Sequence, residues 1–150
     1  MATTITPQTL TVVLTESITL NNEPVNSQNK LLIPNINEVD KRILSVPPSS
    51  EITLVQFSTI PSAGTFVRNN VKYVRITNKD SVNYARIRVK KNGSDTFDVR
   101  VDAGQNFIMS NTKINTSDTA AAFVTFEDAD SISAQADSAD IDMEYFVAST

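Results

Sequence analysis

Cysteine and histidine, which supply many catalytic nucleophiles, general bases and metal ligands, are both absent from this 150-residue chain. Their absence excludes disulfide bonds, thiolate and imidazole metal sites, and active sites built on a cysteine or a histidine. Tryptophan is also absent and there are only 3 tyrosines, which leaves few aromatic platforms for a sugar ring. We therefore expect a protein that is not an enzyme and that holds no cofactor.

Small polar and β-branched residues make up much of what is present, with 17 threonines, 15 serines, 14 asparagines, 15 valines and 13 isoleucines. This composition favours strands and turns over helices, and the length fits one domain. The longest apolar run, residues 120–124, is too short to cross a bilayer, and residues 1–20 lack the pattern of a secretory signal. We expect a soluble chain that starts near Met1 and has no membrane partner.

The charges are segregated along the chain. Residues 71–113 carry nine basic and four acidic side chains, whereas residues 114–150 carry eight acidic side chains and no basic one. A basic segment can bind nucleic acid, but the isoelectric point is about 4.7 and the segment has no aromatic RNA-binding motif and no zinc knuckle. The sequence therefore predicts no nucleic-acid partner.

Alternating apolar and polar residues predict two strands at residues 84–90 and 97–102. A three-residue loop at 91–93, closed by Gly93 in the left-handed conformation, keeps apolar side chains on one face of the resulting hairpin. The predicted pairs are Ile87 with Phe97, Ala85 with Val99, and Arg86 with Asp98.

A second hairpin is predicted from alternation over residues 131–136 and 140–147, joined by a turn near Asp137 and Ser138. Helical structure is limited to a short turn near residues 116–122, because Ile36, Val39 and Ile43 fit either a helix or a strand. Further strands are predicted at residues 9–14, 17–20, 52–57, 71–77, 105–109 and 123–127.

These elements predict an all-β protein, an antiparallel, jelly-roll-like β-sandwich of about eight strands with at most one short helical turn. Residues 1–8 are expected to form a flexible or partner-ordered arm, and residues 9–150 a single sandwich domain. The side chains expected to face inward are Ile76, Ile87, Val89, Phe97, Val99, Val101, Ile141, Met143 and Tyr145.

Acidic side chains crowd the segment from Glu127 to Glu144. The spacing of a helix-loop-helix calcium site is absent, and residues that alternate along a strand form a ridge and do not converge on one ion. We expect a solvated face and no metal site. A calcium site at the turn that carries Asp128 and Asp130 is the alternative.

Basic side chains form the candidate partner-binding surface. They are Lys72, Arg75, Arg86, Arg88, Lys90 and Arg100. One hypothesis is a solvated sheet face with internal ion pairs, which contribute little each. The other is a docking face that meets an acidic surface, either the C-terminal segment of a second copy or another protein, and that sets orientation more than affinity.

A motif in the middle of the chain carries a family resemblance. Residues 71–80, with Arg75-Ile76-Thr77-Asn78 followed by Asp80, then Asn83, the strand 84–89 and residues 101–105, resemble small virion proteins of tailed bacteriophages. The likeness covers residues 38–113, departs from the pattern at Ala103, where proline is frequent, and brings no catalytic residues.

The resemblance implies a virion location, with assembly in the host cytoplasm, and a symmetric assembly. The exposed edge strands of a sandwich need protection, which predicts a homotrimer or another closed homo-oligomer. It implies a capsid decoration or cement protein whose partners are further copies of itself and the major capsid protein. A tail, baseplate or fibre component is the alternative within the virion. A glycan or host-surface binding module is a further alternative, and it would require Tyr73, Tyr84 or Tyr145 to line a groove. An enzyme is the last alternative, and it would require carboxyl groups with raised pKa values in a pocket.

Overall fold

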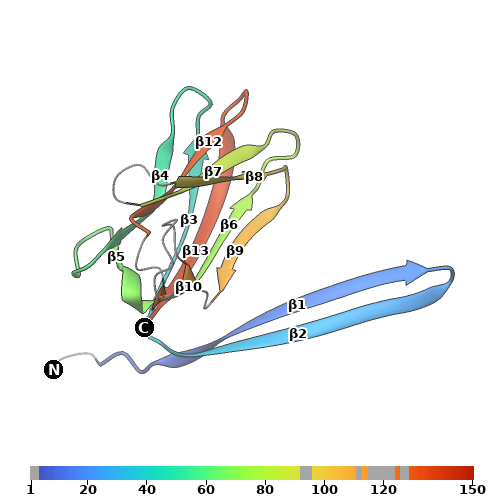
Figure 1. Cartoon of the computed structure of the whole chain (residues 1–150), viewed down its shortest axis with the longest axis horizontal. Helices are drawn as coiled ribbons and strands as arrows, with labels where there is room; N and C mark the ends of the chain where they lie inside the picture. The colour runs from blue at the N-terminus through green and yellow to red at the C-terminus, as the bar shows by residue number, and fades with distance from the viewer. Residues whose placement is uncertain (1–3, 92–95, 111–112, 115–123, 126–128) are drawn as a thin grey trace. The chain divides into compact units, whose positions relative to one another are not determined.

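The computed structural model describes residues 4–91, 96–110, 113–114, 124–125 and 129–150. Within these residues, strands and loops make up the chain, with a single 3-10 turn at Arg68–Asn70. The chain divides into two compact units, Met1–Asn37 and Glu38–Thr150. Figure 1 shows the long two-stranded ribbon of the first unit and the layered sheets of the second. The all-β class predicted from the sequence is confirmed.

The first unit is a β-ribbon made of strands β1 (Gln8–Leu20) and β2 (Glu23–Ile36), which pair antiparallel over almost their whole length. Asn21 and Asn22 form the turn with φ values of 51° and 67°. Positive φ at both central residues is the conformation of a type I′ turn, which matches the twist of a hairpin and which asparagine tolerates well.

The ribbon differs from the sequence prediction in three respects. Residues 9–14 and 17–20 belong to one continuous strand, β1. The prediction divided the chain after residue 8, whereas the two compact units divide after Asn37. The strand β2 was not predicted because it contains Pro24 and Pro34. In a two-stranded ribbon both strands are edges, where proline is accommodated.

The second unit contains two sheets that enclose one core. The four-stranded sheet has the order β3 (Glu38–Val46), β13 (Ile141–Ser149), β6 (Val71–Asn78) and β9 (Asn106–Ser110). The five-stranded sheet has the order β5 (Phe66–Val67), β4 (Ile52–Ser58), β12 (Ser131–Ala136), β7 (Ala85–Lys90) and β8 (Thr96–Val101). All pairs in these sheets are antiparallel except β4 with β5. The short strands β10 (Lys113–Ile114) and β11 (Val124–Thr125) pair with each other.

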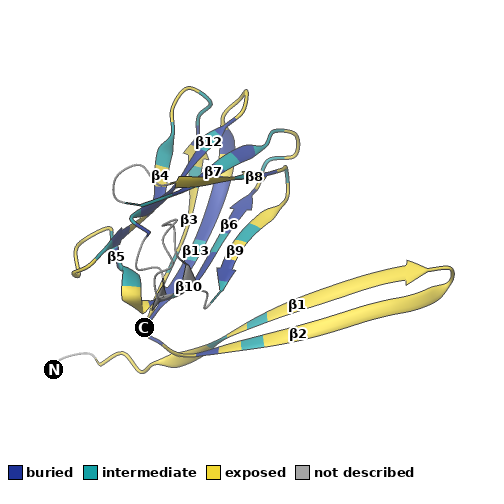
Figure 2. Cartoon of the chain, viewed as in Figure 1, coloured by how far each residue is buried: buried dark blue, intermediate teal, exposed yellow. Residues whose placement is uncertain are grey.

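The core lies between the inner faces of these two sheets. Ile87 and Ile132 of the five-stranded sheet belong to the same buried cluster as Ile76 and Met143 of the four-stranded sheet, and none of the four is exposed. Figure 2 shows the buried residues concentrated on β12, β13 and β6. This packing is that of a sandwich, in which alternate residues of each strand point inward.

The predicted pairing of β7 with β8 is wrong in register. Ile87 lies opposite Val99 and Ala85 opposite Val101, so that β8 is displaced by two residues from the predicted alignment, and Arg88 takes the place of Arg86 opposite Asp98. A shift of two residues leaves every side chain on its original face, so the apolar pattern cannot detect it. Residues 92 and 93 of the predicted turn lie outside the described residues.

Phe97 is the clearest exception among the side chains expected to face inward. It is 39% exposed, and Val99 is only partly buried, because both lie on β8 at the edge of the five-stranded sheet. The other seven are buried as predicted. Alternation therefore identified the correct face of the strand but not its depth in the sheet.

The predicted second hairpin is also wrong. The strands β12 and β13 do not pair with each other, because β12 lies between β4 and β7 while β13 lies between β3 and β6. Their short connection passes from one sheet to the other. Alternation establishes that a segment is a strand, but it does not select the neighbour to which the strand bonds.

The region around Val39 and Ile43 is the strand β3 and not a helix. The predicted helical turn at residues 116–122 lies within residues 115–123, which the structure does not describe. Across the part of the chain that it does describe, no helix has the length and apolar character needed to cross a membrane.

Candidate interaction surfaces

The six basic residues of the candidate surface are divided between two sheets. Lys72 and Arg75 lie on β6 of the four-stranded sheet. Those on the five-stranded sheet are Arg86, Arg88 and Lys90 of β7 and Arg100 of β8. They therefore do not form one continuous basic face.

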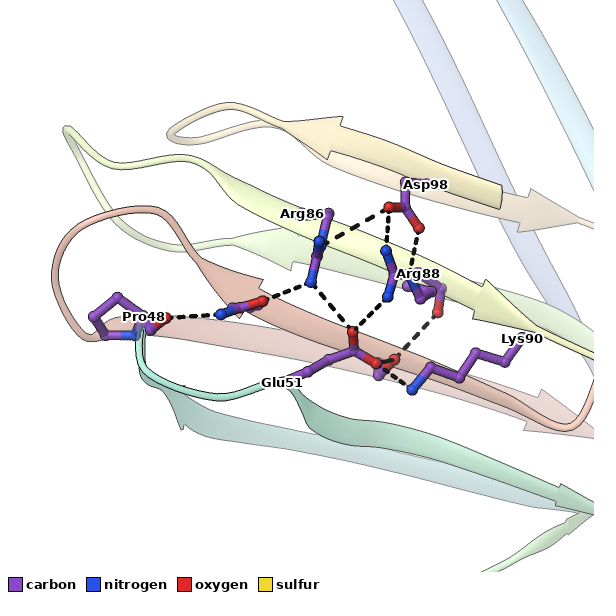
Figure 3. Close-up of polar contacts among 8 residues, drawn as sticks. Pro48, Glu51, Arg86, Arg88, Lys90 and Asp98 are labelled. Atoms are coloured by element: carbon purple, nitrogen blue, oxygen red, sulfur yellow. Dashed lines mark hydrogen bonds and ion pairs between the residues drawn. The ribbon is translucent and has the colours of Figure 1, made fainter. Parts of the chain in front are cut away.

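Glu51 is the centre of a polar cluster on the outer face of the five-stranded sheet (Figure 3). It lies just before β4, and its side chain is 17% exposed. Arg86 and Arg88 each donate to its Oε2 at 3.3 Å, Lys90 pairs with its Oε1, and the Ser133 hydroxyl donates to Oε1 at 2.5 Å. Three cations from β7 thus share one carboxylate, which the sequence analysis did not single out.

Asp98 and Gln135 accept further hydrogen bonds in this cluster. The Nε and Nη2 atoms of Arg88 donate to the two oxygens of Asp98 at 2.7 Å each, a bidentate pair. Arg86 donates to Oε1 of Gln135 at 2.5 Å, and Gln135 donates to the Pro48 carbonyl at 2.8 Å. The guanidinium groups on β7 are therefore held by the protein's own acceptors and have limited capacity for a partner.

The pKa values of both carboxyl groups reflect this arrangement. Burial raises the pKa of Glu51, but the hydrogen bonds from Lys90 and Ser133 and the charges of Lys90 and Arg88 outweigh it, and the net pKa lies below its ordinary value of 4.5. The hydrogen bond from Arg88 is the main cause of the lowered pKa of Asp98. Both groups are ionised at neutral pH, which does not suit a general acid.

A second ion cluster lies on the outer face of the four-stranded sheet. Glu144 is buried, and it accepts from Arg75 at 2.6 Å and pairs with Lys41 at 3.2 Å. Burial raises the pKa of Glu144, but Arg75 and Lys41 together lower it below its ordinary value. Lys72, at the start of the same strand as Arg75, donates to the Asn69 carbonyl at 2.9 Å.

Arg100 stands apart from both clusters. It stacks over the ring of Tyr84, with its guanidinium carbon 4.0 Å from the ring centroid, and its Nε donates to Asp102 at 2.7 Å. The side chains of Arg100 and Asp102 are 64% and 60% exposed. Among the six basic residues, Arg100 is therefore well placed for an outside contact.

The motif on which the family resemblance rests has a structural role. Asn78 is fully buried, donates from Nδ2 to the carbonyls of Asn83 and Val101, and accepts from the Asp80 amide at 3.0 Å. The Asp80 carboxylate accepts from the amides of Asn83 and Val82 at 2.6 and 2.7 Å, and these bonds lower its pKa. These side chains replace backbone partners in the turn between β6 and β7.

The calcium alternative finds no support in the described part of the chain. Asp130 pairs with Arg68 at 2.6 Å, and Asp128 lies outside the described residues. Among the residues that are described, no three carboxylate side chains are grouped as a metal site would require.

Two hollows in the second unit include tyrosines. One, of about 370 Å³, is lined by Glu38, Asp40 and Tyr145, and the Tyr145 hydroxyl donates to Asp40 at 2.8 Å. Burial and this hydrogen bond raise the pKa of Tyr145 to about 12. The other, of about 520 Å³, includes Tyr84 beneath Arg100. One ring face of Tyr84 is thus already stacked, whereas Tyr73 is buried, so the tyrosines offer little open ring surface to a sugar.

The ribbon carries the main apolar surface that the sequence analysis did not identify. In its register, even-numbered residues of β1 share a face with odd-numbered residues of β2. This face, called the aliphatic face, contains Leu10, Val12, Leu14, Ile18, Leu20, Val25, Leu31 and Ile33, together with the polar residues Glu16, Glu23, Ser27 and Asn29. The opposite face is mainly polar, with threonines, a serine, asparagine, glutamine and lysine next to Val13, Pro24 and Leu32.

The part of the aliphatic face toward the Asn21-Asn22 turn is open to solvent. Leu14, Ile18, Leu20 and Val25 are 52% to 56% exposed (Figure 2). Isolated large apolar residues on a surface are ordinary, but Ile18, Leu20 and Val25 adjoin one another, and an exposed apolar cluster marks an interaction site. The alternation of Leu10, Val12 and Leu14 was a usable signal, since it places these side chains on one side of a strand.

Comparison of the chain with protein-family models, with curated proteins and with solved structures found no match. Its function is therefore argued from the surfaces described above.

Replacing Glu51 with Gln is expected to destabilise the second unit by about 2 kcal/mol, because three cations would lose their shared anion and the partial exposure of the cluster limits the loss. Asp102→Asn is the matched control, since its ion pair with Arg100 is exposed, and it should change stability by less than about 0.5 kcal/mol. Urea unfolding followed by circular dichroism measures both. Equal effects of the two variants would contradict the role assigned to Glu51.

Acid is expected to destabilise the same unit. The folded-state pKa values of Glu51, Asp98 and Glu144 lie below their ordinary values of 4.5, 3.8 and 4.5. The stability that these groups contribute is present above the ordinary values and is lost as pH falls through the lowered ones. The urea midpoint should therefore be steady at weakly acidic pH and fall below pH 4.5. A midpoint that stays constant down to about pH 3 would contradict the ion clusters.

Proposed function

We propose that this chain is a non-enzymatic structural subunit of a virion of the tailed-phage type, a capsid decoration or cement protein that acts as a closed homo-oligomer such as a trimer. The observation that carries the proposal is the ribbon, which presents an aliphatic face with four residues more than half exposed. A two-stranded ribbon is at best marginally stable alone in water. Such an element is suited to pack against another protein surface.

The strand order of the second unit supports the proposal, and we propose that this unit is a jelly roll. Without the two-residue strand β5, its sheets have the orders β3-β13-β6-β9 and β4-β12-β7-β8. Numbered along the chain, these eight strands follow the orders 1-8-3-6 and 2-7-4-5, in which the first and last strands are neighbours. Jelly rolls are frequent in viral capsid proteins and in lectins, so the fold alone does not decide between the two classes.

The polar surfaces favour the structural class. The tyrosines offer little open ring surface for a glycan, and the carboxyl groups of Glu51, Asp98 and Glu144 have lowered pKa values, unlike a catalytic acid. The basic residues on β7 are paired with carboxylates of the same chain, and they therefore orient a partner at most. We assign the main contact surface between subunits to the ribbon.

Imaging of purified particles tests this function. The chain would carry a C-terminal tag, and the tag would be located by electron microscopy on intact virions, with an untagged virion as control. A regular pattern of tags on the head is the expected result. Tags confined to tails or fibres would move the proposal to a tail component, and particles without the chain would refute a virion function.

A further inference from the structure

We infer that the occupant of the ribbon's aliphatic face is the same face of a second copy of this chain. This inference rests on the proposed function, and it adds the partner, the contact residues and their alignment. In the ribbon, eleven residue pairs of β1 and β2 run without interruption from Leu10 with Ile33 to Leu20 with Glu23.

Each pair of residues that lie opposite each other on the aliphatic face forms a row, and the rows differ in polarity along the ribbon. Ile18 lies opposite Val25, and this row is fully aliphatic. Glu16 lies opposite Ser27, so one row in the middle of the face is polar and carries a charge. A partner that covers the face must place an apolar surface over the first row and a polar group over the second.

A second ribbon that points in the same direction meets both requirements. When the symmetry axis of a closed oligomer runs parallel to the ribbons, each row packs on the same row of its neighbour. The aliphatic row of Ile18 and Val25 then packs on its copy, and Glu16 meets a row that includes the Ser27 hydroxyl. In the reversed direction, Glu23, which lies opposite Leu20, would face the fully aliphatic row of Leu10 and Ile33, where a carboxylate has no polar partner.

The size of the face sets the strength of the contact. Two strands of eleven paired residues cover on the order of 350 Å² in projection. Six of the pairs lie on the aliphatic face, and eight of their twelve residues are aliphatic. A contact between two such faces lies at the small end of specific interfaces. We therefore expect the association to depend on protein concentration in the micromolar range.

Site-specific cross-linking tests this contact in the full chain, which has no cysteine of its own. Ile18→Cys places a thiol on the aliphatic face, and Ser17→Cys, the matched control, places one on the opposite face next to it. With a short bismaleimide, Ile18→Cys is expected to give roughly tenfold more covalent dimer, because the packed faces raise the effective thiol concentration. Circular dichroism checks that both variants are folded.

The outcomes separate this inference from the proposed function. Equal cross-linking of the two folded variants would overturn the contact between ribbons. Absence of a covalent dimer in both variants would overturn it too, and this is the result expected if the ribbon packs on another protein instead. Particles that lack the chain would refute the virion function, yet they would leave a cross-link through Ile18→Cys intact.

Discussion

Ile132→Asp is expected to unfold the second unit at room temperature. Ile132 lies on β12 between Val55 of β4 and Val89 of β7, and all three side chains are essentially unexposed. The substitution removes a core side chain and places a carboxylate among aliphatic groups, which costs on the order of 5 kcal/mol or more. Domains of this size are stable by about 5 to 15 kcal/mol. Loss of the cooperative urea transition is the expected observation.

Two variants control this experiment. Thr96→Asp adds the same carboxylate to an exposed position on β8, opposite Lys90, and should change stability by less than about 0.5 kcal/mol. Ile132→Val keeps the site apolar and should cost about 1 kcal/mol. A folded Ile132→Asp variant that unfolds cooperatively at the same urea concentration as Thr96→Asp would contradict the position of β12 in the core.

Most strands of the second unit could be predicted from the sequence because they alternate between a buried and an exposed face. The segments 52–57 and 71–77 correspond closely to β4 and β6. Pairing could not be predicted in the same way, because a shift of two residues or a change of neighbour leaves the alternation unaltered. The register of β8 and the separation of β12 from β13 both follow from tertiary packing.

The interaction surfaces were less predictable than the strands. The basic residues of β7 were found, but their pairing with Glu51 was not, since 35 residues separate Glu51 from Arg86 in the sequence. The ribbon was not predicted because Pro24 and Pro34 lie within β2, and proline ordinarily argues against a strand. Asn21-Asn22 was the overlooked signal, as paired asparagines favour a type I′ turn.

Charged substitutions on the aliphatic face of the ribbon are expected to abolish self-association. Leu14→Asp combined with Ile18→Asp places two carboxylates in each copy at positions where aliphatic side chains should pack. Burying them would cost at least about 3 kcal/mol in total, which raises the dissociation constant by a hundredfold or more. Thr15→Asp combined with Ser17→Asp adds the same charges to the opposite face and should leave the association unchanged.

The molar mass in solution tests the central claim, which is that copies of the chain assemble through the ribbon. Light scattering during size-exclusion chromatography, at micromolar concentrations, should give a multiple of the 16.4 kDa chain mass for the wild type and for the Thr15→Asp, Ser17→Asp variant. The Leu14→Asp, Ile18→Asp variant should elute as a folded species of 16.4 kDa. A wild-type chain that remains at 16.4 kDa throughout the concentration range, or an oligomer that survives the charged aliphatic face, would contradict the account.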